Sequence, residues 1–209
     1  MLVSTSFLSS NNPAKDIKIL NETDTDFIHV DVMDGKFVDN KTMPFREMKN
    51  ISKYTSKRLD VHLMVENPEK YIKDYAQLNT EYITIHLEIE NPEKYLEEIK
   101  DYGIKAGISI KPNTEIKDVI PYLPLVDLIL IMSVEPGKGG QEFLEDVPNR
   151  IKELRNILKE YKKEAIINID GGINNKTVEK CKKAKSDMVV SGSYILNGED
   201  YQARINSLR

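Results

Sequence analysis

The sequence predicts an α/β protein of the (β/α)₈, or TIM-barrel, class, because short apolar runs alternate with charged segments of helical periodicity along the chain. Eight such runs are 6 or 7 residues long, a typical strand length. Eight repeats of strand and helix favour a closed barrel over an open sheet. The alternative is a doubly wound open sheet, but its G-x-G-x-x-G motif does not follow the first strand.

The predicted strands are rich in β-branched residues and are separated by helical segments without a linker or low-complexity tract. One barrel domain covering residues 1–209 is therefore expected. In chain order, the predicted strands are residues 2–7, 27–32, 58–64, 82–87, 104–110, 126–132, 165–170 and 187–192.

Three predicted helical segments are the clearest. Residues 67–78 and 91–102 each open with Asn-Pro, a combination typical of a helix N-cap followed by proline at the first helical position. The longest predicted helical segment covers residues 145–164. Pro112 and Asn113 also suggest a helix start, and residues 192–193 are expected to open the last helix.

Composition limits the classes of function. With 209 residues, 40% of them hydrophobic, the chain can bury a sizeable core. The net charge is −4 and acids and bases are interspersed, which argues against a nucleic-acid surface. The lone Cys181 cannot form an internal disulfide, and no signal peptide or run of about 18 apolar residues is visible. A soluble cytoplasmic protein that binds neither nucleic acid nor membrane is expected.

Histidines and aspartates gather at predicted strand ends. The three histidines, His29, His62 and His86, each fall within a predicted strand, and His62 and His86 lie in the last half of theirs. Because side chains alternate along a strand, His29 and Asp31 share a face, and Asp170 ends the seventh strand. Two imidazoles and two carboxylates at one barrel mouth suit Zn²⁺, Mn²⁺, Fe²⁺ or Co²⁺.

The structural alternative is that each histidine is a hydrogen-bonded core residue, which is the commoner role of a single histidine on an apolar strand. Four polar residues on three strands favour a site, because burying Asp31 and Asp170 without a partner is costly. His62 also shares a face with Asp60, and His86 is expected to support a ligand or to line the site beside Glu88.

Glycines form a second cluster after strands six, seven and eight. In this fold, phosphate is often bound by the loops after strands seven and eight, where backbone N–H groups can approach an anion. The alternative is that glycines simply end strands in any barrel. Residues 136–140, PGKGG, are long enough to form a flexible flap. The six glycines are Gly137, Gly139, Gly140, Gly171, Gly172 and Gly192.

Taken together, HVDVMDG, DVHLM, MSVEPGKGGQ, IDGGI and SGS resemble the ribulose-phosphate 3-epimerase family, in the same order and over nearly the whole chain. The resemblance implies a TIM barrel of the ribulose-phosphate-binding type. It also implies an isomerase of the pentose phosphate pathway, which interconverts D-ribulose 5-phosphate and D-xylulose 5-phosphate. The reaction would be a metal-assisted, two-base proton transfer at C3 through an enediolate.

The resemblance assigns roles residue by residue. His29, Asp31, His62 and Asp170 match the ligands of one divalent metal ion per subunit, with Zn²⁺ favoured over Mn²⁺, Fe²⁺ or Co²⁺. Asp31 and Asp170 match the two acid/base residues. The resemblance also implies a phosphorylated ketose as substrate and a homo-oligomer, either a dimer or a hexamer.

Further positions match the substrate-binding stretches and an apolar lining of the pocket. The substrate-binding positions are Ser6, His62, Gly137, Lys138, Gly139, Gly140, Asp170, Gly171, Gly172, Gly192 and Ser193. The lining positions are Met33, Met64 and Met132.

The chain departs from the family pattern at three places. Thr5 replaces a proline, Lys138 replaces an aromatic residue of the flap, and residues 40–45, NKTMPF, lack a Gly-Pro pair. One hypothesis is that Lys138 reaches the substrate phosphate; the alternative is a solvated surface lysine.

Three other functions are weighed. An allulose-6-phosphate 3-epimerase would share the barrel, metal and mechanism but accept a six-carbon substrate. A Schiff-base aldolase would need a buried lysine, for which Lys111 is the candidate. A non-catalytic phosphosugar-binding barrel would not need both Asp31 and Asp170 near a reacting carbon.

Overall fold

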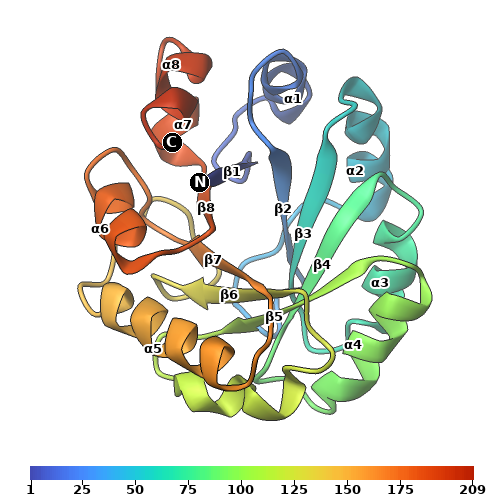
Figure 1. Ribbon diagram of the computed structural model, residues 1–209. Coiled ribbons are helices and arrows are strands. Elements are labelled where there is room, and N and C mark those ends of the chain that lie inside the picture. Colours follow the sequence, from blue (N-terminus) through green and yellow to red (C-terminus); the bar gives the residue numbers. More distant parts are fainter.

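A computed structural model describes residues 1–209 as one closed barrel of eight parallel strands surrounded by helices (Figure 1). The strands follow one another around the barrel in sequence order, and β1 closes the ring by pairing with β8. The predicted (β/α)₈ class is therefore confirmed. No helix is long and apolar enough to cross a membrane.

Every observed strand agrees with its predicted range to within two residues at either end. This agreement reflects the near-continuous apolar runs of a parallel sheet that is buried on both faces. The strands are β1 Leu2–Ser6, β2 Phe27–Met33, β3 Arg58–Met64, β4 Thr80–His86, β5 Lys105–Ile110, β6 Leu128–Met132, β7 Ile166–Asp170 and β8 Met188–Ser191.

The outer ring consists of eight α-helices and two short 3₁₀ helices. The segment between β5 and β6 contains only a 3₁₀ helix, with Pro121 inside it. The α-helices are α1 Pro13–Asn21, α2 Phe45–Ile51, α3 Glu69–Tyr75, α4 Pro92–Asp101, α5 Val147–Glu160, α6 Thr177–Ala184, α7 Ser193–Leu196 and α8 Tyr201–Asn206. The 3₁₀ helices are η1 Ser52–Tyr54 and η2 Ile116–Tyr122.

The two Asn-Pro helix starts differ from the expectation. Pro92 is at the start of α4 as predicted, but Asn91 has a left-handed backbone (φ 52°) and its side chain makes no cap hydrogen bond. An N-cap normally has extended dihedral angles, which aim the side chain at the first N–H groups. Helix α3 begins at Glu69, with Pro68 at the cap position, so Asn67 does not cap it.

Two other predicted helix starts are only partly correct. Gly192 and Ser193 open a helix, the four-residue α7, that is not the last one, because the chain then continues into α8. The chain does continue helically after Lys111–Asn113, but only from Ile116, because the Thr114 N–H donates to the Lys111 carbonyl in a turn (3.1 Å).

The main core lies between the barrel wall and the helices. In β4, Ile83 and Ile85 point outward and are fully buried in this core, whereas Thr84 and His86 lie on the opposite, inward face. Strand β4 therefore contributes apolar side chains to the outer core and polar ones to the barrel interior, whereas the inward-facing Leu128, Leu130 and Met132 of β6 belong to a smaller apolar cluster. Cys181 is buried on α6 as a free thiol.

Candidate metal and substrate site

Strands β2 and β3 place three of the four predicted ligands. The register pairs Asp31 with His62, and His29 lies two residues before Asp31 on the same inward face. His29 is the third of seven residues in β2, so it lies deeper in the barrel than the predicted strand end. Asp170, the last residue of β7, completes the group.

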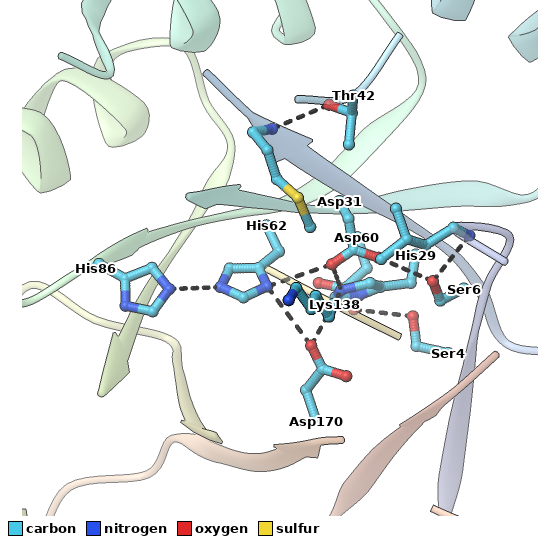
Figure 2. Close-up of polar contacts among 12 residues, drawn as sticks. Ser4, Ser6, His29, Asp31, Thr42, Asp60, His62, His86, Lys138 and Asp170 are labelled. Atoms are coloured by element: carbon cyan, nitrogen blue, oxygen red, sulfur yellow. Dashed lines mark hydrogen bonds and ion pairs between the residues drawn. The ribbon is translucent and has the colours of Figure 1, made fainter. Parts of the chain in front are cut away.

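The four side chains converge on one point (Figure 2). One donor atom from each residue lies within 4.8 Å of the other three. The His29 Nε2 atom is 3.4 Å from Asp31 Oδ1 and 3.7 Å from Asp170 Oδ2. The His62 Nδ1 atom is 3.6 Å from each of the same two oxygens.

The donor set fits a divalent metal ion. His29 Nε2 and His62 Nδ1 are buried and have no hydrogen-bond partner. Unpaired buried polar atoms are costly, and a cation accepting both nitrogen lone pairs and both carboxylates would remove that cost. Two imidazoles and two carboxylates suit Zn²⁺ and the other transition metals expected above.

Asp60 fixes the orientation of the His29 ring. The His29 Nδ1 atom is 2.8 Å from Asp60 Oδ2, which also accepts a hydrogen bond from the Ser4 hydroxyl (2.8 Å). Because a carboxylate only accepts, Nδ1 carries the hydrogen and the lone pair on Nε2 faces the cluster. Sequence reasoning placed Asp60 beside His62 and missed this contact. The available signal was an aspartate inside an otherwise apolar strand, which needs a polar partner once it is buried on the inward face.

His62 has a support of its own. Its Nε2 atom lies 2.9 Å from His86 Nε2, and His86 Nδ1 lies 3.0 Å from Glu88 Oε2 (Figure 2 shows the two histidines). His86 therefore supports a predicted ligand and also contacts Glu88. Burial lowers the pKa of His86 to about 4, although Glu88 acts in the opposite direction.

The electrostatics of the cluster favour positive charge at its centre. Burial alone would lower the pKa of His29, but Asp31 and Asp60 raise it well above its usual value. Burial would likewise raise the pKa of Asp31, but His29 and His62 hold it far below its usual range. Asp31 thus stays ionised, and its negative charge attracts a cation in the barrel interior.

A cavity opens above the cluster at the barrel mouth. His62 is fully buried beneath it and is not one of its lining residues, so the predicted contact of His62 with substrate is not seen directly. All other predicted substrate and lining positions are present. They are Ser6, Met33, Met64, Met132, Gly137, Lys138, Gly139, Gly140, Asp170, Gly171, Gly172, Gly192 and Ser193, and the predicted acid/base residue Asp31 lines the cavity as well.

Glycine is required where the loops after β7 and β8 approach their neighbours. Gly171 has φ 121°, and a Cβ atom there would lie 2.4 Å from a methyl group of Val134. A Cβ atom on Gly192 would lie 3.0 Å from the Ser6 carbonyl oxygen. These contacts leave backbone groups, rather than side chains, facing the cavity.

The flap after β6 rests on the loop after β2. The Asn40 side chain donates to the Gly137 carbonyl oxygen (3.2 Å), and Gly137 packs against Val38. Lys138 is exposed and is the only cationic residue among those that line the cavity, whose other charged residues are acidic. Lys111, the aldolase candidate, does not line this cavity; its Nζ lies 4.1 Å from the Phe37 ring centre.

The barrel and the cluster at its mouth together define a class: a TIM-barrel enzyme with a candidate centre for metal binding and acid/base chemistry. Solved structures agree on the fold. The 3-hexulose-6-phosphate synthase of Salmonella typhimurium matches with a TM-score of 0.70 at 17% identity, covering 100% of this chain and 96% of that one.

Sequence comparison defines the family. The model of the ribulose-phosphate 3-epimerase family matches residues 2–196. The ribulose-phosphate 3-epimerase of Helicobacter pylori is 39% identical over 100% of this chain and 97% of its own length. That of Synechocystis is 37% identical over 100% and 93%. The chain belongs to the ribulose-phosphate 3-epimerase family, a family of isomerases, and the resemblance predicted from its motifs is confirmed.

Proposed function

We propose that this chain interconverts D-ribulose 5-phosphate and D-xylulose 5-phosphate, using Asp31 and Asp170 as its two acid/base groups. The observation that carries the proposal is the meeting of these two carboxylates with two lone-pair imidazole nitrogens at the floor of one cavity. Family membership supports the substrate, because the similar chains are named for this reaction.

Epimerisation at C3 explains why two carboxylates are needed. The proton on C3 is removed from one face of the substrate and replaced from the other, so one group acts as base and a second as acid. Asp31 and Asp170 come from different strands, β2 and β7, and can act on the reacting carbon from different sides. The direction of the reaction decides which carboxylate begins ionised.

Three parts of the chain would support these proton transfers. Ser6 donates to Asp31 Oδ2 (2.8 Å) and orients that carboxylate. His29, Asp31, His62 and Asp170 would hold a divalent cation, which when bound would act as a Lewis acid toward the enediolate charge. Met33, Met64 and Met132 would keep the reacting carbons away from water.

The phosphate would lie against the backbone at the ends of β7 and β8. Gly171, Gly172, Gly192 and Ser193 line that end of the cavity, and the flap residues Gly137–Gly140 would cover it. Zn²⁺ is the proposed metal. A homo-oligomer, dimer or hexamer, and a cytoplasmic location complete the proposal.

A coupled epimerase assay tests the proposal. Metal-stripped protein is given D-ribulose 5-phosphate before and after addition of Zn²⁺, Mn²⁺, Fe²⁺ or Co²⁺. We expect activity to return with metal and to be lost in Asp31→Asn. No activity with any metal, followed by turnover of allulose 6-phosphate, would move the assignment to the six-carbon substrate. Inactivity on both would leave a sugar-phosphate-binding barrel.

A further inference from the structure

We infer that His86 and Glu88 are positioning residues that aim the Nδ1 lone pair of His62 at the metal site. The inference rests on the proposed function, because it concerns the metal centre of that same site. Neither residue lines the substrate cavity, so any effect of theirs on the reaction passes through His62. The contacts run outward from the cluster: His62 contacts His86, as Figure 2 shows, and His86 contacts Glu88.

Glu88 sets the direction of this chain of hydrogen bonds. Its Oε1 atom accepts from the Lys111 backbone N–H (2.8 Å) and the Thr114 hydroxyl (2.5 Å), both in the turn after β5. Its Oε2 atom lies 3.0 Å from His86 Nδ1. A carboxylate held by these donors acts only as an acceptor, so His86 Nδ1 must carry a hydrogen and donate it.

The same logic fixes His62. A neutral His86 with its hydrogen on Nδ1 has a lone pair on Nε2, which must accept from the Nε2–H of His62 at 2.9 Å. His62 then has its own lone pair on Nδ1, the buried atom that has no hydrogen-bond partner and lies 3.6 Å from Asp31 and Asp170. The other tautomer of His62 would point a hydrogen at the cation.

Packing holds the chain of contacts in place. His62 and His86 are fully buried and their rings stack with centroids 5.0 Å apart. Phe37, on the loop after β2, packs against His86, and the two ring centroids are 4.6 Å apart. The Glu88 side chain is 20% exposed, and its carboxylate contacts His86, Lys111 and Thr114. The arrangement mirrors that of His29 with Asp60, with one histidine inserted between ligand and carboxylate.

The test measures metal affinity by chelator competition with Zn²⁺, in the full chain. Glu88→Gln offers one acceptor oxygen, which cannot serve both His86 and the turn after β5. We expect the dissociation constant for Zn²⁺ to rise about 10- to 100-fold, the usual cost of losing such a partner. Glu90→Gln, an exposed glutamate two residues away, is the matched control and should bind as the wild type does.

A double-mutant cycle shows whether Glu88 acts through His86. His86→Phe keeps the ring but removes the acceptor, so adding Glu88→Gln to it should change the affinity no further. His86→Gln restores an acceptor and should recover part of the affinity lost in His86→Phe. Circular dichroism confirms that each variant is folded, and the visible spectrum of bound Co²⁺ reports the ligand geometry.

The outcomes separate the inference from the proposed function. If the wild type binds no Zn²⁺ or Co²⁺, the proposed metal site itself is wrong. If the wild type binds metal and folded Glu88→Gln binds it equally well with an unchanged Co²⁺ spectrum, the positioning role is overturned. Additive losses in the double variant would also overturn it, because Glu88 would then act independently of His86.

Discussion

The two faces of the barrel wall differ in what they bury. The outward face of β4 places Ile83 and Ile85 in a continuous apolar core of 43 residues. The inward face carries Thr84 and His86, next to the ligand cluster. Of the nine buried side-chain polar atoms without a hydrogen-bond partner, six belong to inward-facing residues. They are His29 Nε2, His62 Nδ1, Thr84 Oγ1, Ser109 Oγ and both amide atoms of Asn168.

This difference indicates that the two faces of a strand such as β4 have different roles. Close apolar packing on the outward face stabilises the fold. Buried polar atoms without a hydrogen-bond partner on the inward face mark places where a ligand or water completes the structure. Residues one position apart in the sequence should therefore respond to mutation in different ways. Substitutions on the inward face should change activity and metal binding, and those on the outward face should change the free energy of unfolding.

The largest expected effect is on the inward face. Asp170→Asn removes one of the two proposed acid/base groups and a metal ligand while keeping the shape of the side chain. We expect kcat with saturating metal to fall about 10²- to 10⁴-fold, the usual contribution of a general acid or base. The exposed Asp118→Asn is the control. Retention of near-wild-type kcat in Asp170→Asn would remove Asp170 from the mechanism.

The outward face should show the reverse behaviour. Ile83→Ala leaves a cavity in the outer core, so the free energy of unfolding should fall by about 2–5 kcal/mol. Urea denaturation measures this loss. Because Ile83 faces away from the ligands, kcat and the Zn²⁺ dissociation constant of the folded variant should stay within about twofold, on the order of 0.4 kcal/mol. A tenfold loss of metal affinity would show that the two faces are not separable.

Metal binding by the inward-facing ligands should also stabilise the folded state as a whole. A ligand that binds only the folded state stabilises it, by about 2.7 kcal/mol when its concentration is 100 times the dissociation constant. Adding Zn²⁺ should therefore raise the melting temperature of the wild type. His29→Gln removes one of the four ligands and should abolish most of that rise. An equal rise in both proteins would place the stabilising metal elsewhere.

A smaller effect is expected at the flap. Lys138 is the only cation lining the cavity, and Lys138→Phe removes its attraction for the substrate phosphate. Because Lys138 is exposed, the contact is worth about 1 kcal/mol, which corresponds to a rise in KM of about fivefold. The salt dependence of KM should weaken as well. If neither changes, Lys138 is a solvated surface residue.

The sequence predicted most of the barrel wall and of the site, because both depend on how side chains alternate between the two faces of each strand. Strand periodicity alone put His29 and Asp31 on one face, and the strand ranges are correct to within two residues. The contact of Asp60 with His29 was not predicted, and His86 was expected to support a ligand without His62 being identified as its partner, because both contacts depend on the pairing between neighbouring strands. That pairing includes a register shift between Leu59 and Asp60 that no single strand reveals.

The smallest effect tests where the inward face ends. Asp34 lies three residues beyond Asp31, but its carboxylate accepts hydrogen bonds from the backbone N–H groups of Lys36 (2.8 Å), Phe37 (3.0 Å) and Glu66 (2.9 Å). Partial burial would raise the pKa of Asp34, but these hydrogen bonds lower it overall. A fully paired carboxylate of this kind should serve the structure of the loop and not the reaction.

The sign of its pH dependence follows from that pKa. A carboxyl whose pKa is lowered by folding stabilises the folded state above its unfolded pKa, and the contribution is lost as the pH falls through its folded pKa. Asp34→Asn should therefore cost less than about 1 kcal/mol at neutral pH, since the group is only partly buried, and the cost should begin to shrink as the pH falls below about 4 and vanish below the lowered folded pKa. Urea denaturation at several pH values measures it, with the exposed Asp39→Asn as control. A difference that does not change with pH, or a large fall in kcat, would extend the functional surface outward to Asp34.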